Sequence, residues 1–256
     1  MVLQLQIKDV TLRYRTRRSE ITAAYRVGFD VHRGERIVLL GPSGCGKSSL
    51  LKAVGGFIRP ISGTIELNSR VVTGPGPDRM MVFQEFDQLL PWKTVLANVV
   101  FALRKGAGMP AQAARARALD AIDAVRLSAF RDAYPHELSG GMKQRVAIAR
   151  AMAMEPELLL MDEPYAALDA LTRQQMQEEL LDLWRETGFS LLFVTHSIDE
   201  AIVIGSRIVV LSPHPGRVRA EIDCRDITEA DRGSPRFHTL HRRIDGLLFG
   251  ETRHHA

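Results

Sequence analysis

The sequence predicts an α/β fold with a mostly parallel sheet, because short buried strands alternate with amphipathic helices along the chain. Continuous apolar runs are typical of strands covered on both faces, and they occur at 36–40, 80–83, 158–162, 191–195 and 208–211. Alternating apolar and polar residues predict half-exposed strands at 27–31 and 64–67. Helical spacing of apolar residues appears between these runs, at 50–58 and at 176–184, the second pattern stopping before Gly188.

Composition fits this interpretation and excludes several classes of protein. The chain has 256 residues, 45% hydrophobic and 25% charged, which suits a folded domain and not a disordered or fibrous protein. The net charge of +4 is a small excess for the size, whereas nucleic-acid binders usually carry basic residues over a whole face. Cys45 and Cys224 are too few for a disulfide framework and lack metal-ligand spacing, which favours a reducing compartment.

The N-terminal region alternates apolar and polar residues over 1–9, which predicts a first strand and not a signal peptide. Its basic cluster, predicted to be a solvated edge with an anion-binding surface as the alternative, comprises Arg13, Arg15, Arg17 and Arg18. No apolar run approaches the roughly 18 residues of a membrane-spanning helix, so any membrane spans would have to come from another chain.

Residues 41–49 match the phosphate-loop pattern, in which two glycines flank four residues and Lys and Ser follow. The segment follows a buried strand and opens a helix, so backbone N–H groups and the positive helix end converge on an anion. Lys47 is expected to reach the β- and γ-phosphates, and the Ser48 hydroxyl to bind Mg²⁺. A chance glycine-rich turn is the weaker alternative. The predicted ATP-binding residues are Gly41, Pro42, Ser43, Gly44, Cys45, Gly46, Lys47, Ser48 and Ser49.

An acidic pair, Asp162 and Glu163, follows the apolar run at 158–161. Ligands of α/β sheets bind beyond the carboxyl ends of the strands, so both acids are expected near the phosphate loop. Asp162 is predicted to hold Mg²⁺, directly or through water, and Glu163 to polarise the attacking water. Capping of the next helix is the alternative, which the phosphate loop upstream makes less favoured.

A third motif, Leu-Ser-Gly-Gly-Met-Lys-Gln-Arg, occupies residues 138–145. Ser139, Gly140 and Gly141 at a helix start make an amide-rich anion site, or by themselves only a helix cap. Together with the two motifs above, it resembles the signature motif of ATP-binding-cassette ATPases, and the resemblance extends to about residue 218. Met142 stands where this family usually has Gln, which leaves the serine and glycine contacts unchanged.

The resemblance implies a P-loop NTPase core, an N-terminal antiparallel β subdomain and an inserted α-helical signature subdomain. Residues 1–256 would form a single domain. Its core with the β subdomain would occupy 1–86 and 156–218, its helical subdomain 87–155, and a C-terminal extension 219–256. The family also implies a head-to-tail homodimer, in which the signature residues of one subunit contact ATP held by the other.

Further residues gain roles only through the resemblance. Gln84 is similar to the glutamine that reaches Mg²⁺ and the water, and His196 to the switch histidine that contacts the γ-phosphate. Asp169 resembles the loop residue that joins the two ATP sites, although Ala166 and Ala167 stand where Ser or Gly is commoner. Tyr14 is a candidate to stack on adenine, with an edge-strand aromatic as the alternative.

Two other features are predicted to be structural. Glu200 lies three residues after Ser197, which is the spacing of a helix capping box. His254 and His255 lie in a charged tail without partners at ligand spacing, so we expect no metal there.

Segments 73–79, 89–92, 142–145 and 212–217 resemble importer ATPases of the nitrate, sulfonate and taurine group. This implies ATP and Mg²⁺ as cofactors and, as partners, two transmembrane permease subunits and a periplasmic or lipid-anchored solute-binding protein. The protein would then lie at the cytoplasmic face of the inner membrane. Residues 89–92 are expected to dock the permease, although Trp92 could equally be subdomain core.

Two other functions fit the sequence less well than an importer ATPase. A soluble ABC ATPase acting on nucleic acid or ribosomes would typically carry two cassettes or a long coiled-coil insertion, and the sequence has neither feature. A regulatory nucleotide-binding module that does not hydrolyse ATP is disfavoured by Glu163, Gln84 and His196.

Overall fold

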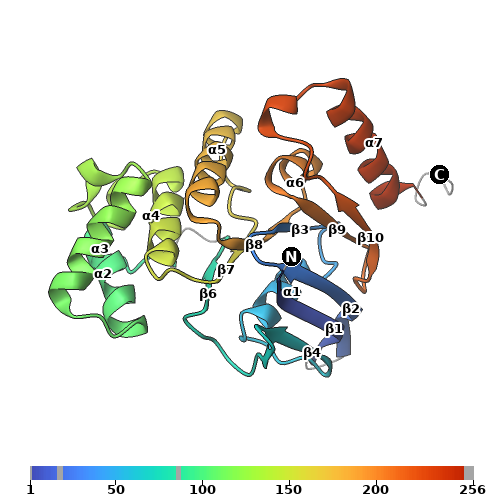
Figure 1. The fold of residues 1–256 in the computed structure, drawn as a ribbon, viewed down its shortest axis with the longest axis horizontal. Coiled ribbons are helices and arrows are strands. Elements are labelled where there is room, and N and C mark those ends of the chain that lie inside the picture. Colours follow the sequence, from blue (N-terminus) through green and yellow to red (C-terminus); the bar gives the residue numbers. More distant parts are fainter. Residues whose placement is uncertain (1, 16–19, 85–87, 251–256) are drawn as a thin grey trace. The chain divides into compact units, whose positions relative to one another are not determined.

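The computed structural model describes residues 2–15, 20–84 and 88–250. The chain forms two compact units, the first comprising residues 1–75 and 190–256 and the second residues 76–189 (Figure 1). Four residues named above lie outside the described ranges: Arg17, Arg18, His254 and His255. The expected subdomain boundaries stay a prediction.

An antiparallel sheet begins the first unit, with the strand order β2-β1-β4-β5. Its strands are β1 (Leu3–Arg15), β2 (Glu20–His32), β4 (Ser62–Leu67) and β5 (Arg70–Val71). Successive residues of a strand point to opposite faces of the sheet, so apolar residues at every second position form one buried face. In β2, Val27, Phe29 and Val31 are buried, while Gly28 between them is exposed. The predicted N-terminal antiparallel subdomain is therefore confirmed.

The parallel strands of the first unit are β3 (Arg36–Leu40), β8 (Ser190–Thr195) and β9 (Arg207–Leu211). β3 lies between β8 and β9 and pairs in parallel with both. An antiparallel edge strand, β10 (Val218–Asp223), follows β9. Ile37 to Leu40 are completely buried, which explains why this strand is a continuous apolar run. The helices of the unit are α1 (Lys47–Val54), α6 (Ile198–Ile204) and α7 (Pro235–Phe249).

In its described residues, 76–84 and 88–189, the second unit combines two parallel strands, β6 (Arg79–Val82) and β7 (Leu158–Asp162), with four α-helices. These helices are α2 (Val95–Gly106), α3 (Ala111–Ala124), α4 (Gly140–Met152) and α5 (Ala170–Thr187). Figure 1 shows α2, α3 and α4 as one group, and the three helices contact each other. Two short 3-10 helices, Ser128–Phe130 and Pro135–Glu137, connect α3 to α4. The helical composition expected after residue 87 is thus confirmed.

Glycine conformations set two helix ends. α5 ends at Gly188, which has a φ of 67° and donates its N–H to Trp184 O, as expected from the sequence. The helix predicted from the apolar spacing at 50–58 ends earlier than expected, because α1 stops at Val54 and Phe57 is 54% exposed. Gly56 has a φ of 80°, and a Cβ there would lie 2.2 Å from the backbone of Gly74, so the chain turns away.

The described part of the C-terminal extension, 219–250, contains regular secondary structure. α7 begins with Ser234 as its cap and Pro235 in its first turn, and it buries Phe237, Ile244 and Leu248. Figure 1 shows this red helix beside α6, which it contacts. These buried residues repeat at helical spacing, which is a sequence signal for this helix. In the described ranges, no helix is both long and apolar enough to cross a membrane.

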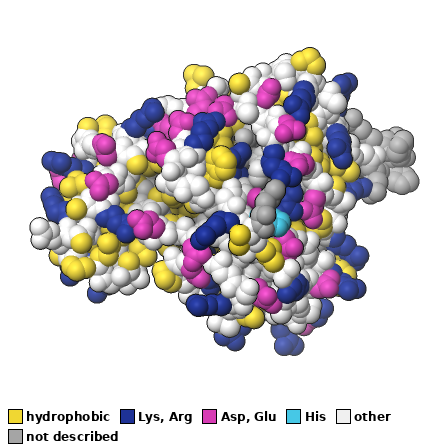
Figure 2. Space-filling view, in the orientation of Figure 1, with side chains coloured by type: hydrophobic (Ala, Val, Ile, Leu, Met, Phe, Trp, Pro, Cys, Tyr) yellow, Lys and Arg dark blue, Asp and Glu magenta, His cyan; other side chains and the backbone are white. Residues whose placement is uncertain are grey.

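Surface charge follows the expectation for a solvated protein. Arg13 and Arg15 are exposed and pair with Glu20, at 2.9 Å and 4.0 Å, so this described part of the basic cluster is a solvated edge. Figure 2 shows basic and acidic side chains interspersed over the face in view. No broad basic face of the kind that nucleic-acid binders use appears on it.

Candidate functional site

The phosphate loop joins β3 to α1 in the first unit. Gly46 caps α1 with a φ of 95°, and Gly44 has a φ of 79°. A Cβ on Gly46 would lie 2.4 Å from Ala23 O, so both its conformation and its surroundings require glycine. The helix starts immediately, because Leu50 N donates to Gly46 O at 2.9 Å. The backbone therefore presents the N–H groups of a helix start, which is the arrangement that binds phosphate.

Lys47 adds a positive charge to this loop. Its side chain is buried, and Nζ donates to Gly41 O at 2.8 Å and to Pro42 O at 3.1 Å. Ser43 and Gly44 form the exposed tip, and Ser48 is half-buried in the first turn of α1. Cys45 is completely buried. The loop fits a polyphosphate group.

His196 directly follows β8, the strand that pairs with β3. β3 and β8 run in parallel with Leu40 opposite Thr195, so Gly41 and His196 follow the carboxyl ends of adjacent strands. The His196 side chain is exposed. Ser197 caps α6 by accepting a hydrogen bond from Glu200 N at 3.3 Å, which confirms that half of the expected capping box. Ser197 N itself donates to Thr195 Oγ1 at 3.0 Å.

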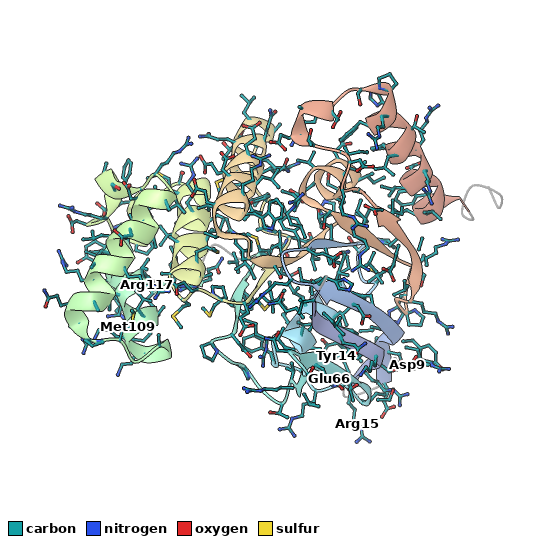
Figure 3. All side chains as sticks on the ribbon, viewed as in Figure 1. Asp9, Tyr14, Arg15, Glu66, Met109 and Arg117 are labelled. Atoms are coloured by element: carbon teal, nitrogen blue, oxygen red, sulfur yellow. The ribbon has the colours of Figure 1, made fainter. Side chains whose placement is uncertain are left out.

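Tyr14 lies near the C-terminal end of β1, as labelled in Figure 3. Its side chain is 38% exposed, and its hydroxyl donates to Ser49 Oγ in α1 at 2.8 Å. The two predicted ATP-binding residues are therefore brought together, although adenine stacking stays a prediction.

In the second unit, β6 and β7 bring Gln84 close to the acidic pair. The strands run in parallel with Val82 opposite Met161, so Gln84 and Asp162 lie at the same edge. Asp162 is 5% exposed, whereas Gln84 is exposed. Glu163 has a φ of 43°, a conformation that non-glycine residues rarely adopt and that is concentrated at functional sites.

A polar network that the sequence analysis missed holds the residue before Gln84. Gln88 accepts from Phe83 N at 3.2 Å and donates to Phe83 O at 2.9 Å. It also donates to Gln144 of α4 at 3.4 Å, and its own carbonyl accepts from Arg150 at 2.8 Å. Burial lowers the pKa of Arg150. The Gln84 segment is thereby tied to the helix that follows the signature motif. A glutamine at an otherwise apolar face of that helix was the available signal.

The signature residues form the start of α4. Ser139 is the cap, and its Oγ accepts from Met142 N at 3.3 Å. The first turn of α4 has no acidic residue, so its positive end stays available to an anion. A Cβ on Gly141 would lie 3.0 Å from Thr172 Cγ2, which places α4 close against α5. Helix capping and anion binding are compatible here, because Ser139 is exposed and Gly140 is half-buried.

Asp169 caps α5. It accepts from Thr172 N at 3.0 Å and from Thr172 Oγ1 at 2.7 Å, and these hydrogen bonds lower its pKa. Ala166 and Ala167 before it are exposed. The structure thus gives Asp169 a local role, and its part in joining two ATP sites stays a prediction.

Residues 89–92 divide into buried and exposed parts. Leu89 is 3% exposed, which contradicts a uniformly exposed cluster, whereas Trp92 is 70% exposed, so the alternative that Trp92 is core is wrong. The turn is held by the buried Asn98 side chain, whose Oδ1 accepts from Leu90 N and whose Nδ2, with two protons to donate, lies within 3.2 Å of the carbonyl oxygens of Leu90, Lys93 and Thr94. Phe101 nearby is 41% exposed, with Lys93 Nζ 5.2 Å from its ring centroid.

The donors expected for Mg²⁺ are divided between the units, with Ser48 in the first and Gln84 and Asp162 in the second. All three offer the hydroxyl, amide or carboxylate oxygens that Mg²⁺ prefers. Over residues 2–15, 20–84 and 88–250, no group of three or more His, Cys, Asp or Glu is arranged to hold a metal.

Comparison with known proteins places these elements in a family. The family described as ABC transporter matches residues 25–166. The taurine import ATP-binding protein of Rhizobium johnstonii is 48% identical over 236 residues, covering 89% of each chain. The taurine import ATP-binding protein of Burkholderia thailandensis is 44% identical over 95% of this chain and 96% of its own.

Solved structures agree. The ATP-binding cassette MJ0796, solved as a dimer in a post-hydrolysis state bound to ADP and Pi, has a TM-score of 0.75 and 34% identity, covering 86% of this chain and 98% of its own. The structure of cbiO1 from Clostridium perfringens has a TM-score of 0.78 and 26% identity, covering 94% of this chain and all of its own.

These matches confirm the predicted fold and the expected use of ATP with Mg²⁺, and none favours the nucleic-acid alternative. The chain therefore belongs to the ABC transporter family, as one of its ATP-hydrolysing cassettes.

Proposed function

We propose that this chain is the ATPase subunit of an importer for taurine or a related small sulfonate. The observation that carries the proposal is the identity of 44 to 48% with taurine import ATP-binding proteins over most of the chain. In this proposal, two permease subunits hold a homodimer of the chain at the cytoplasmic face of the inner membrane. A periplasmic or lipid-anchored protein delivers the solute.

Nucleotide binding is assigned to residues 41–49 and Tyr14. Lys47 donates to neutral carbonyl oxygens of the loop, and the charged oxygens of a phosphate are stronger acceptors for its ammonium group. The N–H groups at the start of α1 add further donors. Tyr14 supplies an aromatic face for the base, because its ring is partly exposed while its hydroxyl is held by Ser49.

Hydrolysis is assigned to the residues at the strand ends. Asp162, Ser48 and Gln84 hold Mg²⁺, which when bound offsets the negative charge of the phosphates. Glu163 orients and polarises the attacking water, and His196 contacts the γ-phosphate. Ser139 to Met142 present the α4 start to the ATP of the second subunit, and Asp169 joins the two sites.

Growth and transport test the proposal. A strain lacking the gene for this chain is supplied with taurine as its sulfur source and complemented with the wild type or with Glu163→Gln. We expect the wild type, and not the variant, to restore growth and uptake of labelled taurine. Unchanged growth of the deletion strain, with lost uptake of nitrate instead, would contradict the sulfonate assignment. ATP hydrolysis stimulated by RNA and not by the permease would contradict the importer.

A further inference from the structure

We propose that the loop formed by residues 212–217, Ser-Pro-His-Pro-Gly-Arg, positions the phosphate loop for nucleotide binding by contacting the Cys45 peptide. The inference rests on the proposed phosphate-binding role of residues 41–49. Both loops belong to the first unit.

The 212–217 loop is closed on itself. Ser212 N donates to Arg217 O at 2.9 Å, and Arg217 N donates to Ser212 Oγ at 3.1 Å. The Ser212 hydroxyl in turn lies 3.1 Å from Pro213 O and 3.2 Å from Pro215 O, either of which accepts its proton. One serine side chain therefore fixes both ends and the interior of the loop, which makes it a stiff element.

This element is anchored on β2. Tyr25 N donates to Gly216 O at 2.9 Å, and Gly216 N donates to Ala23 O at 3.1 Å, so Gly216 pairs with Ala24 like a residue of a neighbouring strand. The Arg217 guanidinium lies 4.5 Å from the centroid of the Tyr25 ring, which adds a cation–π contact. Gly216 consequently has a fixed position.

From that position Gly216 touches the phosphate loop. A Cβ on Gly216 would lie 2.0 Å from Cys45 O and 3.2 Å from Cys45 C, so the two backbones are in direct contact. The next residue of the phosphate loop is also in close contact with β2, because a Cβ on Gly46 would lie 2.4 Å from Ala23 O. At the start of the loop, a Cβ on Gly41 would lie 3.1 Å from Leu211 O, the residue that precedes Ser212.

These contacts bear on binding because the peptide bond is planar. The Cys45 carbonyl and the Gly46 N–H belong to one peptide unit, so a contact that fixes the carbonyl also fixes the direction of the N–H. Gly46 caps α1, and its N–H is among the donors that a phosphate loop directs at its ligand. The 212–217 loop thus acts through Cys45 as a positioning element and need not touch nucleotide.

The test measures the Kd of MgATP by isothermal titration calorimetry and the melting temperature of the nucleotide-free protein. Gly216→Ala pushes on Cys45 O and should raise Kd by about tenfold, the loss expected for one hydrogen bond to a charged group. Ser212→Ala loosens the loop and should raise Kd severalfold, whereas Ser212→Thr keeps the hydroxyl and should restore it. Gly74→Ala is the matched control, because a Cβ there meets nothing within 4 Å, and its Kd should stay at the wild-type value.

A purely structural role would lower the melting temperature of the variants and leave the Kd of the folded protein unchanged, and that result overturns the inference. If Gly216→Ala does not fold, Ser212→Ala and Ser212→Thr provide the test: a raised Kd of MgATP for Ser212→Ala, restored in Ser212→Thr, supports the inference, and a lowered melting temperature with unchanged Kd overturns it. Lys47→Ala separates the two levels of the argument. Normal MgATP binding by Lys47→Ala contradicts the proposed phosphate loop itself, whereas lost binding there with unchanged Kd in the Gly216 and Ser212 variants contradicts only the positioning role.

Discussion

The hydroxyl of Tyr14 donates a 2.8 Å hydrogen bond to Ser49 Oγ, and this bond links the N-terminal antiparallel sheet to the helix that follows the phosphate loop. The two residues are far apart in sequence, and neither motif nor periodicity predicts their contact. The bond holds the Tyr14 ring close to α1 while the side chain remains 38% exposed. A residue proposed to stack on the base is thereby held next to the residues proposed to bind the phosphates.

Tyr14 variants separate the ring from the hydroxyl. Tyr14→Ala should weaken ATP binding by about tenfold or more, because stacking of an aromatic ring on a base contributes about 1 to 3 kcal/mol. Tyr14→Phe keeps the ring and loses only the bond to Ser49, so its Kd should change far less. Titration of a fluorescent ATP analogue measures both. Tyr134→Ala, which removes a tyrosine that is 42% exposed in the second unit, is the control. Equal affinities for Tyr14→Ala and the wild type would leave Tyr14 as an edge-strand aromatic.

Glu163 and Lys47 should fail at different steps. Glu163→Gln removes the carboxylate that polarises water, so it should keep ATP binding, nearly abolish turnover and accumulate an ATP-bound dimer. Lys47→Ala should lose binding and hydrolysis together. Phosphate release and size-exclusion chromatography with ATP measure the two properties. Glu186→Gln, an exposed position late in α5, should behave as the wild type. A monomeric Glu163→Gln protein with the wild-type rate would refute the assignment.

The fold could be predicted where burial leaves a strong local signal. β3 and β7 match their apolar runs residue for residue, and β6, β8 and β9 begin one residue earlier than expected. The end of α1 at Val54 has a local signal, because Gly55 and Gly56 follow it directly and glycine ends helices, as Gly188 ends α5. The close approach of Gly74 to Gly56 could not be predicted, because it is a tertiary contact between residues distant in sequence.

The candidate site divides in the same way. The phosphate loop, the acidic pair and His196 lie at or directly after strand ends, and a strand end can be found from the sequence because the apolar run stops there. The signature residues instead follow a 3-10 helix and open α4. The contact between Gly216 and Cys45 could not be found in this way, because the close approach of two backbones leaves no periodic pattern in the sequence. The Gln88 network left one trace, the polar Gln144 on the apolar face of α4, whereas its partners Gln88 and Phe83 carry no pattern.

Glu35 should make stability depend on pH. Burial by itself raises the pKa of this carboxyl. Hydrogen bonds from His32 N at 2.8 Å and from Arg207 at 2.9 Å, together with the charge of Arg207, lower the pKa by more than burial raises it. The pKa of Glu35 therefore lies below its ordinary 4.5. A lowered pKa means that the stabilisation is complete above the unfolded value and is lost as pH falls through the folded value. Stability should therefore decline as the pH falls below 4.5.

Glu35→Gln isolates this contribution. The variant should be less stable than the wild type at neutral pH by about 1 kcal/mol, since it loses a charge-assisted hydrogen bond. The difference should shrink as the pH is lowered, because protonation removes the same charge from the wild type. Urea unfolding followed by circular dichroism at several pH values measures it, with Glu186→Gln as the exposed control. A difference that is independent of pH would show that the Glu35 charge does not contribute.

Trp92 should be needed for the permease and not for catalysis or folding. Because it is 70% exposed on a turn that the Asn98 side chain holds, Trp92→Ala should leave the melting temperature and the ATPase rate of the isolated subunit near wild type. Loss of an aromatic anchor at an interface can cost about 2 kcal/mol or more, so co-purification with the permease and solute uptake should fall. Leu89→Ala is the contrasting variant, since truncating a buried leucine should destabilise the subunit by about 2 to 5 kcal/mol. Normal assembly and uptake with Trp92→Ala would contradict a docking role for Trp92, and Phe101, 41% exposed with Lys93 Nζ 5.2 Å from its ring centroid, would be the next residue to change.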